Sequence, residues 1–240
     1  MTSTTTSNKV DGGHPPAKRF KPTYSGTITI LAGTGETLFE VHKDIICKHS
    51  DFFVASCSKA WAEGKEGTVK LPTVESATVK LYIHWAYTGN INLDVLDYGP
   101  GLASNYGQTA QLFRLYIAAD MFLDRIMKNK AMDTILQRMN KRTFAVDWHS
   151  ANLVWDNTTG DSPLRSAILH WSAATTTRDG FSKAVLSLRP AFVIDLAGTL
   201  LDLKGEAAFA KYPTYERRSQ YHDHGVDNVK CSEKCSTQMT

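Results

Sequence analysis

The segment from Phe39 to Phe53, FEVHKDIICKHSDFF, gathers two histidines, a cysteine and two aspartates among large apolar residues. Histidines that bind one metal from a single helix normally stand three or four residues apart, whereas His42 and His49 are seven apart. Ile45 and Ile46 follow His42 by three and four residues and precede His49 by four and three. On a helix, both histidines would therefore share one stripe with isoleucines. The spacing favours a packing helix over a metal site.

A second group of possible metal ligands lies near the carboxyl end of the sequence. His222 and His224 precede Cys231 and Cys235. A zinc finger normally presents its cysteine pair about a dozen residues before its histidine pair, with hydrophobic positions between them. Neither condition is met, and we expect no bound metal here.

Catalytic motifs are also missing from the sequence. Gly33 and Gly35 stand between two runs typical of strands, whereas a dinucleotide site needs a third glycine and a following helix. No nucleophile elbow, HExxH pair or phosphate loop supports an enzyme built on His42, His49 or His84. We therefore predict that the protein is not an enzyme and uses no cofactor.

Composition indicates a globular protein. Of 240 residues, 42% are hydrophobic and 10% aromatic, and no apolar run reaches the roughly 18 residues of a membrane span. The first residues lack the apolar region of a secretory signal, so we expect a cytoplasmic or nuclear protein with free thiols. A net charge of +3 with basic clusters only at Lys18–Lys21 and Arg217–Arg218 gives no nucleic-acid footprint. The first cluster is either a nuclear import signal or part of a solvated tail.

The order of predicted elements indicates an α+β domain. A tail over residues 1–23 precedes a hairpin formed by TITIL and LFEV, and Ser50 is a good cap for a helix through Phe53. That helix presents Cys57, Ala60 and Trp61 on its apolar face, and we expect Cys47 and Cys57 to be small core residues. A strand at TVKLP follows, then helices over 74–88 and 108–123 and a further run to Met139. Together these predict a small sheet with helices around it.

This order of motifs resembles a BTB (POZ) domain of the kind common in fungal proteins. The resemblance covers residues 24–140 and rests on FEVHKDIICKHSDFF, WAEGKEG, VKLP, YIHWAYTGNI and LYIAADMF, in that order. It implies a protein-interaction module without catalytic activity. It also implies that six residues of the first motif serve the fold: Phe39, Val41, His42, Ile45, Ser50 and Phe53.

Two features depart from the family pattern. Many BTB proteins form homodimers by exchanging an amino-terminal helix and strand, but residues 1–23 contain no segment able to form that helix. Many members also begin the first strand with Ser-Asp, and that aspartate lines a pocket used by transcriptional repressors. Here Ser25 is followed by Gly26. We therefore do not expect the swapped dimer or co-repressor docking, and the oligomeric state stays open.

Residues 141–204 are expected to form a helical carboxy-terminal extension. Ser162 followed by Pro163 is typical of a helix start, and Pro190 ends one helix and opens the next. In BTB adaptors for cullin-type ubiquitin ligases, helices in this position enlarge the cullin-binding surface. The last residues, 205–240, are polar, and we expect a disordered tail.

The resemblance implies a substrate adaptor for a cullin-type ubiquitin ligase, with a protein partner and no direct contact with nucleic acid or membrane. The alternative is an oligomerising scaffold or a transcription-linked regulator. The binding surface is expected on the helices over 74–88 and 108–123. Aromatic anchors dominate many interfaces, so the candidate contacts, where exposed, are Trp61, Tyr82, Trp85, Tyr98 and Tyr106.

Overall fold

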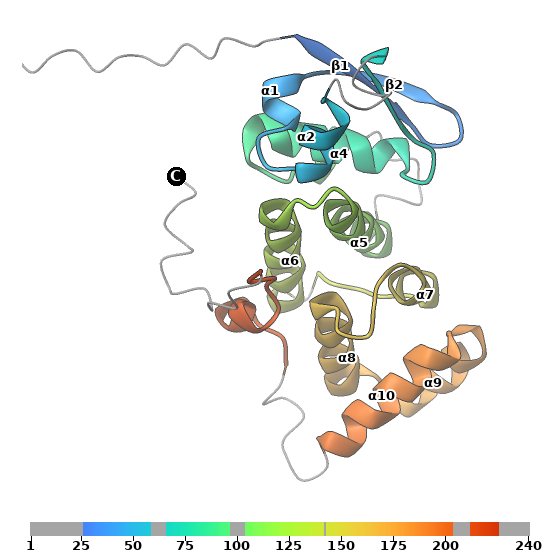
Figure 1. Cartoon of the computed structure of the whole chain (residues 1–240). Helices are drawn as coiled ribbons and strands as arrows, with labels where there is room; N and C mark the ends of the chain where they lie inside the picture. Colours follow the sequence, from blue (N-terminus) through green and yellow to red (C-terminus); the bar gives the residue numbers. More distant parts are fainter. Residues whose placement is uncertain (1–25, 59–65, 97–103, 142, 204–211, 226–240) are drawn as a thin grey trace, which may run out of the picture.

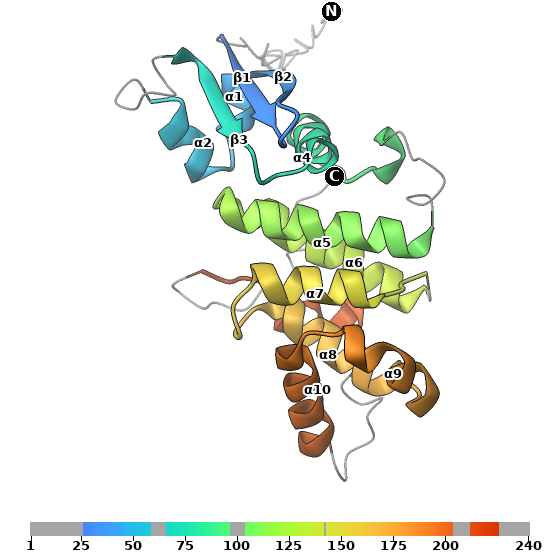
Figure 2. The same cartoon turned by 90° about the vertical axis from the view of Figure 1, so that its right-hand side faces the viewer.

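The computed structural model describes residues 26–58, 66–96, 104–141, 143–203 and 212–225. Its elements are stacked in layers (Figures 1 and 2). A three-stranded sheet with short helices lies at one end, helices α5 and α6 lie in the middle, and the carboxy-terminal helices lie at the far end. This is the α+β arrangement with a helical extension that the sequence predicts.

The sheet has the order β2-β1-β3. Strands β1 (Thr27–Ala32) and β2 (Thr37–His42) form an antiparallel hairpin, and β3 (Thr68–Leu71) runs parallel to β1. Gly33 and Glu36 adopt positive φ in the hairpin turn, which glycine does without steric cost. The predicted hairpin and the TVKL strand are confirmed. Alternate residues of β1 are buried, as expected for a strand with one face on a core.

The helix predicted to carry both histidines is interrupted. Helix α1 (Lys43–Ile46) begins after His42 and ends before His49, so the prediction of one shared isoleucine stripe is wrong. A new helix, α2 (Asp51–Ser56), begins at Ser50, whose hydroxyl accepts the Phe53 backbone N–H at 3.1 Å. The cap prediction for Ser50 is confirmed.

The two cysteines of this region are half-buried and pack against the edge of the first core, so the expected core positions are confirmed in part. Cys57 ends α2, and its sulfur lies 3.3 Å from that of Cys47. Burial, the largest of several causes, raises the pKa of Cys47 to about 12. Ala60 and Trp61, predicted on the same helical face, lie outside the described residues.

A first core lies between the sheet and the middle layer. Helix α4 (Ser76–Thr88) ends at Gly89 in the left-handed conformation and buries Tyr82 and Trp85. The short helix η1 (Leu93–Val95) leads to α5 (Asn105–Met121) and α6 (Arg125–Asn140). Aromatic rings fill the centre, where Phe53 and Phe122 are 5.0 Å apart between ring centroids.

A second core joins the middle layer to the extension. Residues of α7 (Trp148–Asn157), α8 (Pro163–Thr175) and α10 (Pro190–Asp202) are buried in it, and Phe181 of α9 (Arg178–Ala184) packs against it. The short helix η2 (Val185–Ser187) connects α9 to α10 and has no buried residue. Helix α5 contributes Leu115 and Ala119 to the first core and Leu112 and Tyr116 to the second. The extension therefore packs on helices of the BTB-like region, with no separate core of its own.

Residues 212–225 correct the expectation of a disordered tail from residue 205. They include the short helix η4 (Tyr215–Gln220) and lie along α6 (Figure 1). Lys128 forms an ion pair with Asp223 at 3.0 Å, and His222 Nε2 lies 2.8 Å from an Asp133 carboxylate oxygen. Tyr212 donates to the Met139 carbonyl. These specific contacts give a defined structure to a segment that its polar composition predicts to be disordered.

The hydroxyl of Ser50 bridges two elements, and removing it tests that bridge. It also donates to the Phe122 carbonyl oxygen at 2.6 Å. The other hydrogen bond to this oxygen is a long one, from the Phe52 N–H at 3.4 Å. We expect Ser50→Ala to lower the free energy of unfolding by about 2 kcal/mol. Ser104→Ala, which removes the exposed cap of α5, should cost about half as much. If urea unfolding gives Ser50→Ala and Ser104→Ala the same loss of free energy, the bridge to Phe122 contributes nothing to stability.

Candidate interaction site

The turn between α5 and α6 is the most constrained feature near the predicted binding surface. It consists of Phe122, Leu123 and Asp124, of which Phe122 and Asp124 are fully buried. Leu123 has φ of 53° and an exposed fraction of 63%. A non-glycine residue in the left-handed region costs roughly 1–2 kcal/mol, and it persists only where its surroundings fix the backbone.

Buried polar groups fix this turn from three directions. Tyr82 donates its hydroxyl to an Asp124 carboxylate oxygen at 2.8 Å, and the other oxygen accepts the Met127 N–H at 2.9 Å. Asp124 therefore joins α4 to the amino end of α6, where a carboxylate is also favoured by the helix dipole. Ser50 holds the preceding Phe122 carbonyl. Desolvation by burial nevertheless raises the pKa of Asp124 and of Tyr82.

The outside of the same turn is apolar. Met121, Leu123 and Ile126 are exposed at the junction of α5 and α6, and Val54 is exposed on α2. A surface groove beside them is lined by Leu123, Ile126 and several polar and charged residues: His49, Asp51, Asp120, Asp124, Arg125, Lys128 and Asp223. We call Met121, Leu123 and Ile126 the turn surface. An apolar centre with a charged rim is the usual composition of a protein interface.

The two histidines of the opening motif do not converge. His42 Nδ1 lies 2.7 Å from the Tyr87 hydroxyl, whereas the His49 ring packs on Trp85 with centroids 5.6 Å apart. Burial lowers the pKa of His49 and so disfavours its charged form. Within the described ranges, no three His, Cys, Asp or Glu side chains are placed to hold a metal ion.

The aromatic candidates for partner contact divide into three groups. Tyr82 and Trp85 are buried in the first core, so their assignment to a binding surface is wrong. Tyr106, at the amino end of α5, is 51% exposed and stays a candidate. Trp61 and Tyr98 lie outside the described residues. Most of α5 is covered by α4, α6 and α7, and its exposed large apolar residues lie near its two ends.

Tyr106 stands at a second groove, between the first turn of α5 and the extension. Trp148, partly exposed at the start of α7, and Trp171 and Leu188 also line it. This groove combines aromatic side chains from five helices, because Phe181 of α9 and Phe192 of α10 also line it.

Sequence reasoning missed the turn surface. Its signal was the run Met121, Phe122, Leu123 directly before the capping residue Asp124. The run does not by itself say which side chain is exposed, because α5 also buries the consecutive residues Gln111, Leu112 and Phe113. The exposure of Leu123 follows from the left-handed backbone at this position, which the sequence pattern does not indicate.

Comparison with known families identifies the domain. The family model of the BTB/POZ domain matches residues 20–130, and a search of curated proteins gave no match. Residues 20–130 are thus a BTB/POZ domain, which belongs to a family of protein-interaction modules that are generally non-catalytic. Among the described segments, no helix has the length and apolar character needed to cross a membrane.

The buried carboxyl of Asp124 gives a test of the turn. Asp124→Ala leaves the Tyr82 hydroxyl without its acceptor and α6 without its cap, so we expect a loss of about 3 kcal/mol in the free energy of unfolding. Asp124→Asn retains the shape and can still accept the Met127 N–H, so its loss should be much smaller. Urea unfolding at pH 7 measures both.

A comparison of the parent protein with Asp124→Asn tests the pKa of Asp124. Because burial raises this pKa in the folded state, the folded protein binds the proton more tightly than the unfolded chain. The parent protein should therefore lose stability relative to Asp124→Asn as the pH rises above the unfolded value of about 3.9 and through the higher folded value. A difference that does not change between pH 3.5 and pH 7 would contradict the raised pKa.

Proposed function

We propose that this protein is a substrate adaptor of a cullin-type ubiquitin ligase, acting in the cytosol or nucleus, and that the turn surface contacts the cullin. The BTB/POZ domain supports a protein partner, and the helical extension has the position of the helices that enlarge the cullin surface in such adaptors. A second candidate, an oligomerising scaffold, is favoured by a separate surface on α10.

The single observation that carries the proposal is the exposed Leu123 in a strained conformation. The first core does not need this side chain, because 63% of it faces solvent. The turn is nevertheless held by buried hydrogen bonds to its two neighbours. A backbone fixed in advance presents the Leu123 side chain at a defined position, so less conformational entropy is lost when a partner binds, which raises affinity.

The surroundings of Leu123 fit a protein partner better than a small ligand. Met121 and Ile126 widen the apolar surface, and Asp51 and Arg125 lie in the groove at its border. Apolar anchors surrounded by polar groups that exclude water are typical of the residues that dominate binding energy. The groove itself is open and lined largely by charged side chains, unlike the enclosed apolar sites of small molecules.

Leu123→Gly separates binding from folding. Glycine adopts positive φ without strain, so the variant should keep its free energy of unfolding within about 1 kcal/mol. We expect it to weaken binding to a cullin amino-terminal domain at least tenfold in a calorimetric titration, a change of about 1.4 kcal/mol. Leu186→Gly is the matched control, because Leu186 is 97% exposed on η2, away from the turn surface.

The control should bind like the parent protein. No binding of the parent protein at tens of micromolar cullin would reject the adaptor function. Binding that Leu123→Gly leaves intact would retain a cullin partner and reject the turn surface as its contact.

A further inference from the structure

Helix α10 is apolar around nearly its whole circumference. Its sequence, PAFVIDLAGTLLD, has polar side chains only at Asp195, Thr199 and Asp202. A helix of this composition is normally buried on all sides. Here α10 lies at the end of the layered molecule farthest from the sheet (Figure 2), and among the described residues one side of it packs on other helices.

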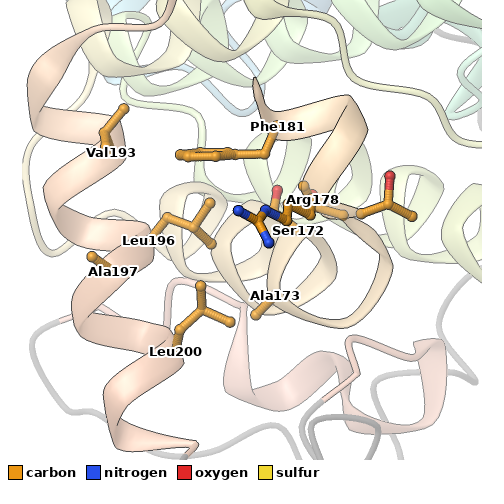
Figure 3. Close-up of a pocket in the computed structure, with 10 residues that line it drawn as sticks. Ser172, Ala173, Arg178, Phe181, Val193, Leu196, Ala197 and Leu200 are labelled. Atoms are coloured by element: carbon orange, nitrogen blue, oxygen red, sulfur yellow. The ribbon is translucent and has the colours of Figure 1, made fainter. Parts of the chain in front are cut away.

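The covered side of α10 is well defined. Phe192, Leu196 and Leu203 are buried, and Asp195 accepts the Trp155 indole N–H at 2.8 Å. On one flank an apolar groove separates α10 from α8 and α9. Figure 3 shows Val193 and Leu200 of α10 along this groove, with the ring of Phe181 across from them.

The opposite side of α10 faces solvent. Ile194 and Leu201 are each 69% exposed, and Ala197 and Gly198 are exposed between them. These four residues form one stripe, since they are spaced by three or four positions. We call them the α10 stripe. No charged residue interrupts the stripe.

We propose that the α10 stripe binds the α10 stripe of a second copy of this chain, with the two helices antiparallel and a two-fold axis between Ala197 and Gly198. This symmetry pairs Ile194 with the partner's Leu201, and Ala197 with the partner's Gly198. A two-fold interface must be complementary to itself. The stripe meets this condition, with large residues at both ends and small residues at the centre, where the helices approach most closely.

Gly198 supports a close approach. Glycine inside a helix weakens it relative to alanine, so its presence needs a reason. The described part of the chain supplies none, because a Cβ added at Gly198 would meet none of its atoms within 4 Å. A second helix packed at this point would occupy that space.

The charges select the antiparallel direction. Asp202 is an exposed carboxylate at the carboxyl end of α10, where the helix dipole disfavours it. In the antiparallel pair it lies near the amino end of the partner's α10, which is the positive end of the helix dipole. Arg189, which precedes α10, already pairs with Asp156 of its own chain at 2.8 Å. In a parallel pair Asp202 would face the partner's Asp202. A partner of the same sequence thus supplies charge complementarity as well as shape.

The test is the mass of the full chain in solution, measured by light scattering from about 1 to 100 μM. We expect the parent protein to approach twice its chain mass of 26.6 kDa as the concentration rises. Gly198→Gln should stay monomeric at 100 μM and unfold at an equal or higher temperature, because glutamine is a good helix former. Ile194→Lys should also be monomeric, and Leu186→Asp should dimerise like the parent protein.

The variants distinguish this interface from others. A parent protein that stays monomeric at 100 μM would overturn the proposal, and so would a Gly198→Gln protein that still doubles its mass. The adaptor function is tested separately, because the turn surface and the α10 stripe share no residue. Loss of cullin binding in Leu123→Gly with an unchanged dimer would leave the α10 interface standing.

Discussion

The hydrogen bond between the Tyr82 hydroxyl and the buried carboxylate of Asp124 is the contact on which the centre of the molecule depends. It joins α4 to the start of α6 across the turn that follows α5. Burying a carboxylate is unfavourable unless hydrogen bonds satisfy it, and here Tyr82 and the Met127 N–H do so. The raised pKa of Asp124 shows that burial still outweighs these bonds. The result is a turn whose inner residues are fixed and whose outer residue, Leu123, is held in solvent.

The position of α5 and α6 explains why the extension and the BTB/POZ domain form one body. Both helices have residues in the core under the sheet and in the core of the extension. A partner on either side therefore binds a surface supported by the same pair of helices. The segment 212–225 adds a further brace along α6, where burial of Asp223 is outweighed by hydrogen bonds from the Gly225 N–H and from Lys128, which lower its pKa. Within the described part of the chain, large apolar or aromatic side chains stay exposed at the turn, at the Tyr106 groove and on α10.

The sequence predicted what periodicity and capping determine. The hairpin, the TVKL strand, the Ser50 cap and the helix starting at Pro163 all follow from local patterns. Patterns of this kind do not fix exposure, so Tyr82 and Tyr106 could not be told apart, although one is buried and the other exposed. The order of residues 212–225 was missed because it rests on pairs such as Lys128 with Asp223, which are 95 positions apart and follow no period. The outward face of α10 was missed because the apolar sequence of this helix predicts burial, whichever helices surround it in the fold.

A double-mutant cycle of Tyr82→Phe and Asp124→Ala, measured by urea unfolding at pH 7, tests the central contact most directly. If the two groups satisfy each other in the core, each single variant leaves one of them unpaired, and the double variant leaves neither. We then expect the double variant to be more stable than the sum of the single losses implies, by about 1–2 kcal/mol. Losses that add within about 0.3 kcal/mol would show that the two groups act independently and would contradict this account of the turn.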